Sequence, residues 1–197
     1  MEKLTASGLL VIGACHGAEL KSVSYDRAAC FEPDPNNFAI LQRNASEIKD
    51  KKIDVFMLAL SDASGEADFH LTSSFYSHSL MTLAEPHRKA FPTIKQGGVI
   101  RVKVRTLDNA MSECRLDPKL YETIWIDVQG AELKVFRGAV KTLENIKTIM
   151  CEVSDVPYYE GGATIDQVDE YLGGFGLKRV ETDMWKADSH GYALYKK

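Results

Sequence analysis

A run of apolar residues near the start of this chain, residues 9–12, is followed at once by residues with very small side chains. These are Gly13, Ala14, Cys15 and, two places further on, Gly17. The abrupt change predicts a buried strand that turns sharply into a helix, with another group lying close to the backbone at the turn. Two alternatives fit this pattern. One is a cofactor bound over the turn, and the other is a secretion signal with a lipid-attachment site at residues 12–15.

The secretion signal is the weaker alternative. Glu2 cancels the positive charge of Lys3, and the apolar run is at the short end of the roughly 7 to 15 residues that such signals use. Removal at Cys15 would also delete a strand that the remaining fold needs. No other stretch approaches the ~20 apolar residues that cross a bilayer. The sequence therefore favours a cytoplasmic protein without a membrane span.

Composition narrows the class of protein further. A chain of 197 residues with 45% hydrophobic and 26% charged residues predicts one globular domain over residues 1–197. The net charge of −4 gives no bulk attraction for nucleic acid. The four cysteines lack CxxC spacing, which argues against a zinc site and a disulfide framework and fits reduced thiols. Nothing in the sequence indicates an oligomeric state.

Short apolar segments alternate with helical patterns along most of the chain. The expected strands are residues 9–13, 28–31, 55–60, 67–71, 99–104, 122–128, 146–153, 177–183 and 191–196. A helix should begin at Pro35 with Asp34 as its N-cap, and two more should cover residues 131–143 and 165–172. The alternation predicts a doubly wound α/β fold: a mainly parallel sheet with helices on both faces and an antiparallel C-terminal strand. Residues 72–92 lack clear periodicity, and we expect a lid or substrate loop there.

Polar or small residues follow several of these strands, at the edge where ligands bind in such sheets. They are residues 13–17, Glu32, Ser61 with Asp62, residues 127–129 and Glu152. A P-loop is excluded because no Gly-Lys-Ser/Thr follows, and the GxGxxG pattern is absent because Cys15 takes its middle glycine position. A carboxylate at Glu32 can accept hydrogen bonds from both hydroxyls of a ribose. The missing phosphate features fit a nucleoside cofactor without phosphate, of which S-adenosylmethionine is the commonest.

Four segments carry a more specific signal. In chain order they read FEPDPNNFAILQRN, ALSDASGEADFHL, VRTLDNAM and IWIDVQGAELKVFRGAVKTL. Together they resemble the FkbM family of S-adenosylmethionine-dependent methyltransferases, and residues 126–133 with Gly138 are the most specific part. The resemblance implies the class I methyltransferase fold, with a sheet of seven strands, and methyl transfer to a hydroxyl of a small molecule, sugar or glycan. The chain differs from the family pattern at Val11, Cys15 and Gln129, where an acid, Asn and Glu are usual.

Position and chemistry assign roles to the residues expected to bind the cofactor. These residues are Gly13, Ala14, Gly17, Glu32, Ser61, Asp62 and Asp127. The small residues would let the backbone approach the methionine part, and Glu32 would hold the ribose. The pair Ser61 and Asp62 is expected at the edge of the adenine ring.

Asp127 and His78 are the candidates for catalysis. Asp127 ends the expected central strand, where it would act as general base, orient the acceptor hydroxyl or contact the cofactor's amino group. His78 lies in the segment expected to overhang the site, and an imidazole titrates near neutral pH. Asp127 with Glu152 would suit a divalent metal ion, but no ligand spacing specifies one, so metal use stays open. A non-catalytic binding module on the same fold is the alternative function.

Overall fold

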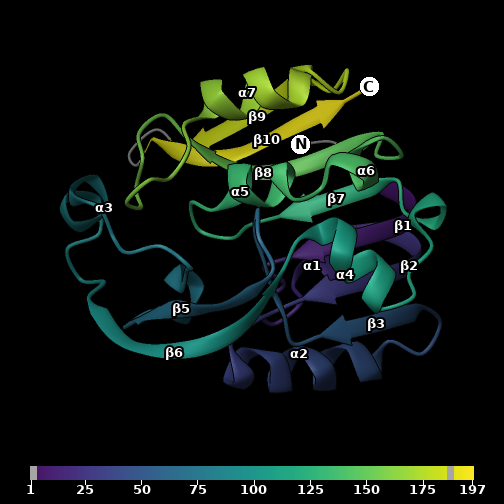
Figure 1. Ribbon diagram of the computed structural model, residues 1–197, viewed down its shortest axis with the longest axis horizontal. Helices are drawn as coiled ribbons and strands as arrows, with labels where there is room; N and C mark the ends of the chain where they lie inside the picture. The colour runs from purple at the N-terminus through teal and green to yellow at the C-terminus, as the bar shows by residue number, and fades with distance from the viewer. Residues whose placement is uncertain (1–3, 186–188) are drawn as a thin grey trace.

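The structure is a computed structural model that describes residues 4–185 and 189–197. Within these residues the chain builds a seven-stranded sheet and a three-stranded sheet (Figure 1). The larger sheet contains β1 (Thr5–Ile12), β2 (Ser24–Phe31), β3 (Lys52–Phe56), β7 (Thr123–Ile126), β8 (Thr148–Ser154), β9 (Lys178–Trp185) and β10 (His190–Lys196). Its spatial order is β3-β2-β1-β7-β8-β10-β9. Glu2 and Lys3, which bear on the secretion signal, lie outside the described residues.

The strand directions confirm the predicted fold class. β2, β1, β7 and β8 lie side by side in that order and pair in parallel with one another, and β3 joins β2 in parallel at one edge. β10 enters between β8 and β9 and is antiparallel to both. The sheet is therefore doubly wound and mainly parallel, with an antiparallel C-terminal strand.

Helices cover both faces of this sheet (Figure 1). They are α1 (Glu19–Ser22), α2 (Pro35–Glu47), α4 (Leu107–Glu113), α5 (Glu132–Arg137), α6 (Val140–Leu143) and α7 (Ile165–Gly173), with a 3-10 turn η2 (Pro118–Leu120). Alternate residues of β1 supply the two cores: Leu10 and Ile12 pack toward α4, α5, α6 and α7, whereas Leu9 and Val11 pack toward α1 and α2. Because β1 is buried on both faces, it reads as a continuous apolar run in the sequence. No helix of the described chain is long and apolar enough to cross a membrane.

Helix α2 begins as its sequence predicts. Asp34 is the N-cap, and its Oδ1 accepts hydrogen bonds from the backbone N–H groups of Asn36 and Asn37 at 2.7 and 3.2 Å. Pro35 occupies the first helical position, where its missing N–H and fixed φ angle cost nothing.

Two predicted elements are divided in the structure. The expected strand 55–60 ends at Phe56, and residues 59 and 60 form a separate short strand, β4 (Ala59–Leu60), in the smaller sheet. The expected helix 131–143 is two helices, α5 and α6, with a break at Gly138. A Cβ at Gly138 would lie 2.2 Å from the carbonyl oxygen of Ser61, so the close packing of these backbones bends the helix out of line.

The smaller sheet has the order β4-β6-β5, with β5 (Gly65–Thr72) and β6 (Gln96–Arg105) as a long antiparallel pair. This pair extends toward the lower left of Figure 1. The segment between its strands contains a 3-10 turn η1 (Phe75–Ser77) and helix α3 (Glu85–Ala90), and a bridge between His70 and Ser79 ties it to β5. Residues 72–92, which the sequence predicts to be irregular, therefore contain a 3-10 turn and a short helix. Part of this segment lies beside the carboxyl ends of the strands of the larger sheet.

We predict that Gly13→Ala destabilises the fold. Gly13 has φ +76°, and a Cβ there would lie 1.9 Å from the carbonyl oxygen of Asp127. Relief of that contact must separate β1 from β7, at a cost of about 2 kcal/mol or more in the free energy of unfolding. Gly98→Ala is the control, since nothing lies within 4 Å of a Cβ at Gly98. Urea unfolding measures both variants, and equal stabilities would contradict the prediction.

Candidate active site

The carboxyl ends of β1, β2 and β7 border a cavity of about 210 Å³. Its wall contains the turn after β1, the residues that follow β2 and β7, and side chains from the smaller sheet and the segment after it. The predicted residues Gly13, Ala14, Glu32, Asp127 and His78 all line it. The topology thus brings together polar groups that are up to 114 positions apart in the chain, from Gly13 to Asp127.

The turn after β1 is held by hydrogen bonds to β2 and α2. The backbone N–H groups of Gly13 and Ala14 both donate to the carbonyl oxygen of Phe31 at 3.0 Å. His16 Nε2 lies 3.1 Å from Asn37 Oδ1, and Asn44 Nδ2 donates to the carbonyl oxygen of His16 at 2.8 Å. These contacts fix the position of the turn, which forms one wall of the cavity.

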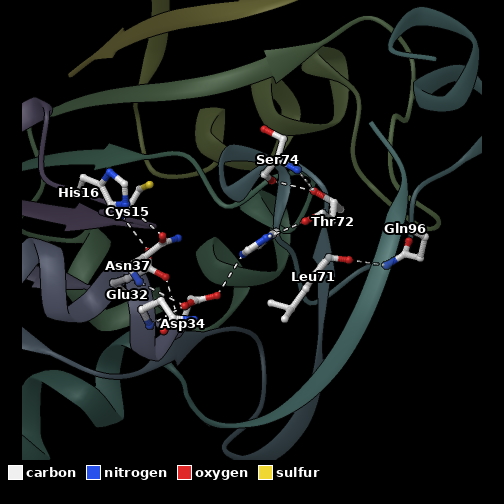
Figure 2. Close-up of polar contacts among 11 residues, drawn as sticks. Cys15, His16, Glu32, Asp34, Asn37, Leu71, Thr72, Ser74 and Gln96 are labelled. Carbon is white, nitrogen blue, oxygen red and sulfur yellow. Dashed lines mark hydrogen bonds and ion pairs between the residues drawn. The ribbon is translucent and has the colours of Figure 1, made fainter. Parts of the chain in front are cut away.

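Glu32 joins the turn to the start of α2 (Figure 2). One of its oxygens, Oε2, accepts from Cys15 N, and Oε1 accepts from Asp34 N, each at 2.8 Å. Burial raises the pKa of Glu32 to about 7, although these two backbone donors act in the opposite direction. Each oxygen of a carboxylate has two lone pairs, so Glu32 can still accept from a ligand in the cavity.

His78 is held between two acceptors. Its Nδ1 lies 3.1 Å from Asp34 Oδ2, and its Nε2 lies 3.3 Å from the carbonyl oxygen of Thr72. Figure 2 shows Asp34 and Thr72 on opposite sides of these two contacts, which are drawn as dashed lines. Because both ring nitrogens face acceptors, neither offers a free lone pair to a hydroxyl. This arrangement anchors the segment after β5 to the N-cap of α2.

Asp127 is fixed by two donors. Gln129 Nε2 donates to its Oδ1 at 2.7 Å, and the Tyr192 hydroxyl donates to its Oδ2 at 2.5 Å. The same Gln129 nitrogen donates to Glu152 Oε2 at 2.8 Å, and Tyr159 donates to Gln129 Oε1 at 2.7 Å. The backbone of Gln129 takes the left-handed conformation, with φ 57°. The Asp127 carboxylate therefore has a defined orientation, and it is also in side-chain hydrogen-bond contact with Glu152.

A second cavity, of about 310 Å³, meets the first at this carboxylate. Both cavities are lined by Tyr76, Asp127, Gln129 and Tyr192. Aromatic rings form a large part of the lining of the second cavity, beside acidic side chains. The rings are those of Tyr76, His87, Phe91, Tyr158, Tyr159, Trp185, His190 and Tyr192. Two ligands, one in each cavity, would meet beside Asp127.

The lining of the first cavity contains acidic side chains and, among the described residues, no Lys or Arg. The acids are Glu19, Glu32 and Asp127. Burial, followed by the charges of Asp127 and Glu32, raises the pKa of Glu19 to about 7. Carboxylates crowded in this way repel an anion and stabilise a cation.

A further acidic cluster lines the second cavity. Carboxylate oxygens of Asp127, Glu132 and Glu152 all lie within 4.8 Å of one another. Burial raises the pKa of both Glu132 and Glu152, and Glu132 Oε1 accepts from the backbone N–H groups of Val128 and Gly130. The Glu132 side chain thus stabilises the turn after β7 by accepting these two backbone hydrogen bonds. The residue types would suit a divalent cation, and metal use stays an open hypothesis.

Three expected site residues line neither cavity. Gly17 is one of them, because it lies in the turn against the side chains of Leu41 and Leu20. Ser61 and Asp62 line neither cavity, because the chain leaves the larger sheet after Phe56 and they follow β4 of the smaller one. Leu58, Ala59 and Leu60 line the first cavity instead. The expectation that Ser61 and Asp62 meet an adenine edge therefore has no support from the cavity's geometry.

Sequence reasoning also missed functional candidates. Tyr192, Tyr159 and Glu19 were not singled out, and the bridging role of Gln129 was not foreseen. Tyr192 lies in an alternating strand, where an inward-facing tyrosine looks like any core residue. Glu19 follows the glycine turn by two positions, and that proximity was the one available signal. Val11, where the family pattern has an acid, is fully buried in the core.

Comparisons with known proteins agree with this geometry. The Methyltransferase FkbM domain family matches residues 12–192. The 2-O-methyltransferase NoeI of Sinorhizobium fredii (strain NBRC 101917 / NGR234) is 32% identical over 154 residues, which cover 75% of this chain and 62% of that protein. The chain thus spans less than two thirds of the length of this curated relative.

Solved structures show the same fold. Methyltransferase FkbM from Methylobacillus flagellatus KT aligns with a TM-score of 0.65 at 14% identity, covering 100% of this chain and 45% of that one. Aeropyrum pernix fibrillarin, solved with natively bound S-adenosyl-L-methionine, aligns with a TM-score of 0.51 at 11% identity, covering 99% of this chain and 68% of that one. The sheet order and the cavity at the strand ends define a Rossmann-like methyltransferase fold. Within that class, the chain belongs to the FkbM methyltransferase family.

The buried acids predict an unusual dependence of stability on pH. Folding raises the pKa of Glu19, Glu32, Glu132 and Glu152 above the ordinary value of 4.5. Between about pH 4.5 and 7 the folded state therefore binds more protons than the unfolded state, and the free energy of unfolding should fall as the pH rises. Each such proton contributes about 1.4 kcal/mol per pH unit. His87, whose pKa burial lowers, opposes this trend, but as one group against four.

Urea unfolding of the protein without ligand at several pH values between 5 and 7.5 checks this prediction. A free energy of unfolding that increases across this range would show that the acids are ionised and compensated in the folded protein.

Proposed function

We propose that this protein transfers a methyl group from S-adenosylmethionine to a hydroxyl of a small molecule or glycan. The observation that carries the proposal is the acidic cavity at the carboxyl ends of β1, β2 and β7, which has three acidic side chains and, among the described residues, no Lys or Arg in its lining. A ligand there should be cationic. S-adenosylmethionine carries a sulfonium and an ammonium group, whereas nicotinamide dinucleotides carry phosphates that these carboxylates would repel.

The residues of the first cavity fit such a cofactor. Glu32 follows β2 with lone pairs free for the ribose hydroxyls, and the turn at Gly13 and Ala14 leaves room for the methionine part. Bound there, S-adenosylmethionine supplies a methyl group on a positively charged sulfur. Asp127 lies where its negative charge would stabilise that sulfonium group.

The second cavity supports a ring-shaped acceptor with hydroxyl groups. Its aromatic lining would pack against the apolar faces of a sugar or similar ring, and the few polar groups would orient the hydroxyls. The relative named a 2-O-methyltransferase also supports a hydroxyl as the methyl acceptor.

Asp127 is the group we assign to the acceptor hydroxyl. It lines both cavities, and its donors Gln129 and Tyr192 fix the orientation of its carboxylate. The carboxylate would orient the hydroxyl and receive its proton, because a neutral hydroxyl is a weak nucleophile. Burial and the neighbouring acids raise the pKa of the Tyr192 phenol, so Tyr192 keeps its proton and continues to position Asp127.

We predict that Glu32→Gln weakens the binding of S-adenosylhomocysteine, the demethylated cofactor, by about 10- to 100-fold, because charge-assisted hydrogen bonds to the ribose are lost. Glu32→Ala should in addition lower the free energy of unfolding, since Cys15 N and Asp34 N lose their acceptor. Calorimetry measures the first effect and urea unfolding the second. An unchanged dissociation constant in Glu32→Gln would remove Glu32 from the cofactor site.

Asp127→Asn should reduce turnover at least about 100-fold, the usual scale for the loss of a general base, with a modest loss of cofactor affinity. The assay is methyl transfer from S-adenosylmethionine to a panel of hydroxylated sugars and small metabolites, alongside calorimetry of cofactor binding. Asp26→Asn is the control, since Asp26 is exposed near the amino end of β2.

The outcomes separate the assignments. Wild-type turnover in Asp127→Asn would exclude it as the base, and complete loss of cofactor binding would make Asp127 a binding residue instead. Failure of the wild-type protein to bind either S-adenosylmethionine or its demethylated product would overturn the proposed function and favour a non-catalytic module.

A further inference from the structure

Glu19 has a carboxylate oxygen that no group in the described structure satisfies. The residue begins α1, two positions after Gly17, and its side chain lines the first cavity. Its Oε2 is buried and has no hydrogen-bond partner among the described residues. The Glu19 carboxylate is in hydrogen-bond contact with its own backbone, and a buried carboxylate oxygen without a donor is destabilising unless something else compensates it. A ligand in the cavity is the natural source of that compensation.

The other two carboxylates of this cavity are already engaged. Both oxygens of Glu32 accept backbone N–H groups, and both oxygens of Asp127 accept side-chain donors. Glu19 is therefore the carboxylate with the greatest unmet demand for a donor. The charged groups that act on Glu19 are Asp127 and Glu32, which are acidic like Glu19 itself. A ligand group that donates to Glu19 should therefore be positively charged.

The two cationic groups of the proposed cofactor can then be assigned to different acids. Asp127 stands where the two cavities meet, which is where the methyl group and its sulfonium must lie for transfer. Glu32 follows β2 and is suited to the ribose. We propose that Glu19 binds the ammonium group at the amino acid end of the cofactor through a charge-assisted hydrogen bond. This assignment rests on the proposed function, and it makes Glu19 a binding residue that selects a cofactor with a free amino group.

The experiment compares two ligands that differ only in that end. S-adenosylhomocysteine carries the amino acid, whereas 5′-methylthioadenosine has the same adenosine and sulfur without it. Calorimetry should show that Glu19→Gln weakens S-adenosylhomocysteine about 10- to 100-fold and changes the methylthioadenosine constant less than about twofold. Glu32→Gln should weaken both ligands, because both contain the ribose. Glu47→Gln is the matched control, since Glu47 is exposed at the end of α2.

A second readout is the pH dependence of binding. The groups whose charges interact with Glu19 are Glu32, Asp127, Cys15, Cys30 and Tyr192. Burial raises the pKa of the two thiols and the phenol well above their ordinary values, so these three stay protonated at neutral pH. The pKa of Glu32 is raised to about 7, as is that of Glu19, but a change in the charge of Glu32 should affect the binding of both ligands. The ratio of the two affinities should therefore shift toward S-adenosylhomocysteine between pH 6 and 8, and this shift should vanish in Glu19→Gln.

Each result decides between the two proposals. Equal losses for both ligands in Glu19→Gln, or no loss for either, would overturn the assignment of Glu19 while leaving the cofactor proposal in place. Retained methylthioadenosine binding shows that the variant is folded. A wild-type protein that binds neither ligand would instead overturn the proposed function itself.

Discussion

The site depends on backbone hydrogen bonds that tie together the ends of three neighbouring strands. Gly13 N and Ala14 N share the carbonyl oxygen of Phe31 at the end of β2, and Asp127 N donates to the carbonyl oxygen of Ile12 at the end of β1, all at 3.0 Å. Only a residue without a Cβ fits at Gly13, because the Asp127 carbonyl occupies that space. The turn after β1 is thereby wedged between β2 and β7, with Glu32 on one side and Asp127 on the other.

This placement brings several carboxylates together in a buried region, and neutral hydrogen-bond donors stabilise them there. The Gln129 amide donates to both Asp127 and Glu152, and the Tyr192 hydroxyl donates to Asp127. A Glu at position 129 would place another carboxylate beside these two and remove their shared donor. Gln129 is therefore a departure from the family pattern that lowers the repulsion between Asp127 and Glu152. Perturbed acids in a cavity are typical of functional sites, where stability is lower than the fold could reach.

Elements governed by local interactions were predictable. The helix start at Asp34 and Pro35 uses groups within three residues of each other, and the apolar run of β1 follows from burial on both faces. The break at Gly138 was not predictable, because it depends on contact with the backbone of Ser61, 77 positions away. The same holds for β4, whose pairing with β6 removes Ser61 and Asp62 from the cavity.

The sequence by itself determined the alternation of strands and helices, the tight turn at Gly13 and the acids that follow β2 and β7, since periodicity, capping and backbone freedom act over a few residues. Only the tertiary structure decided which polar groups meet. It brought Tyr192 to Asp127 from 65 positions away, engaged both nitrogens of His78, and left one oxygen of Glu19 without a partner in the described structure. These outcomes depend on strand order and on the path of the smaller sheet, which arise from packing between distant segments and leave no local pattern in the chain.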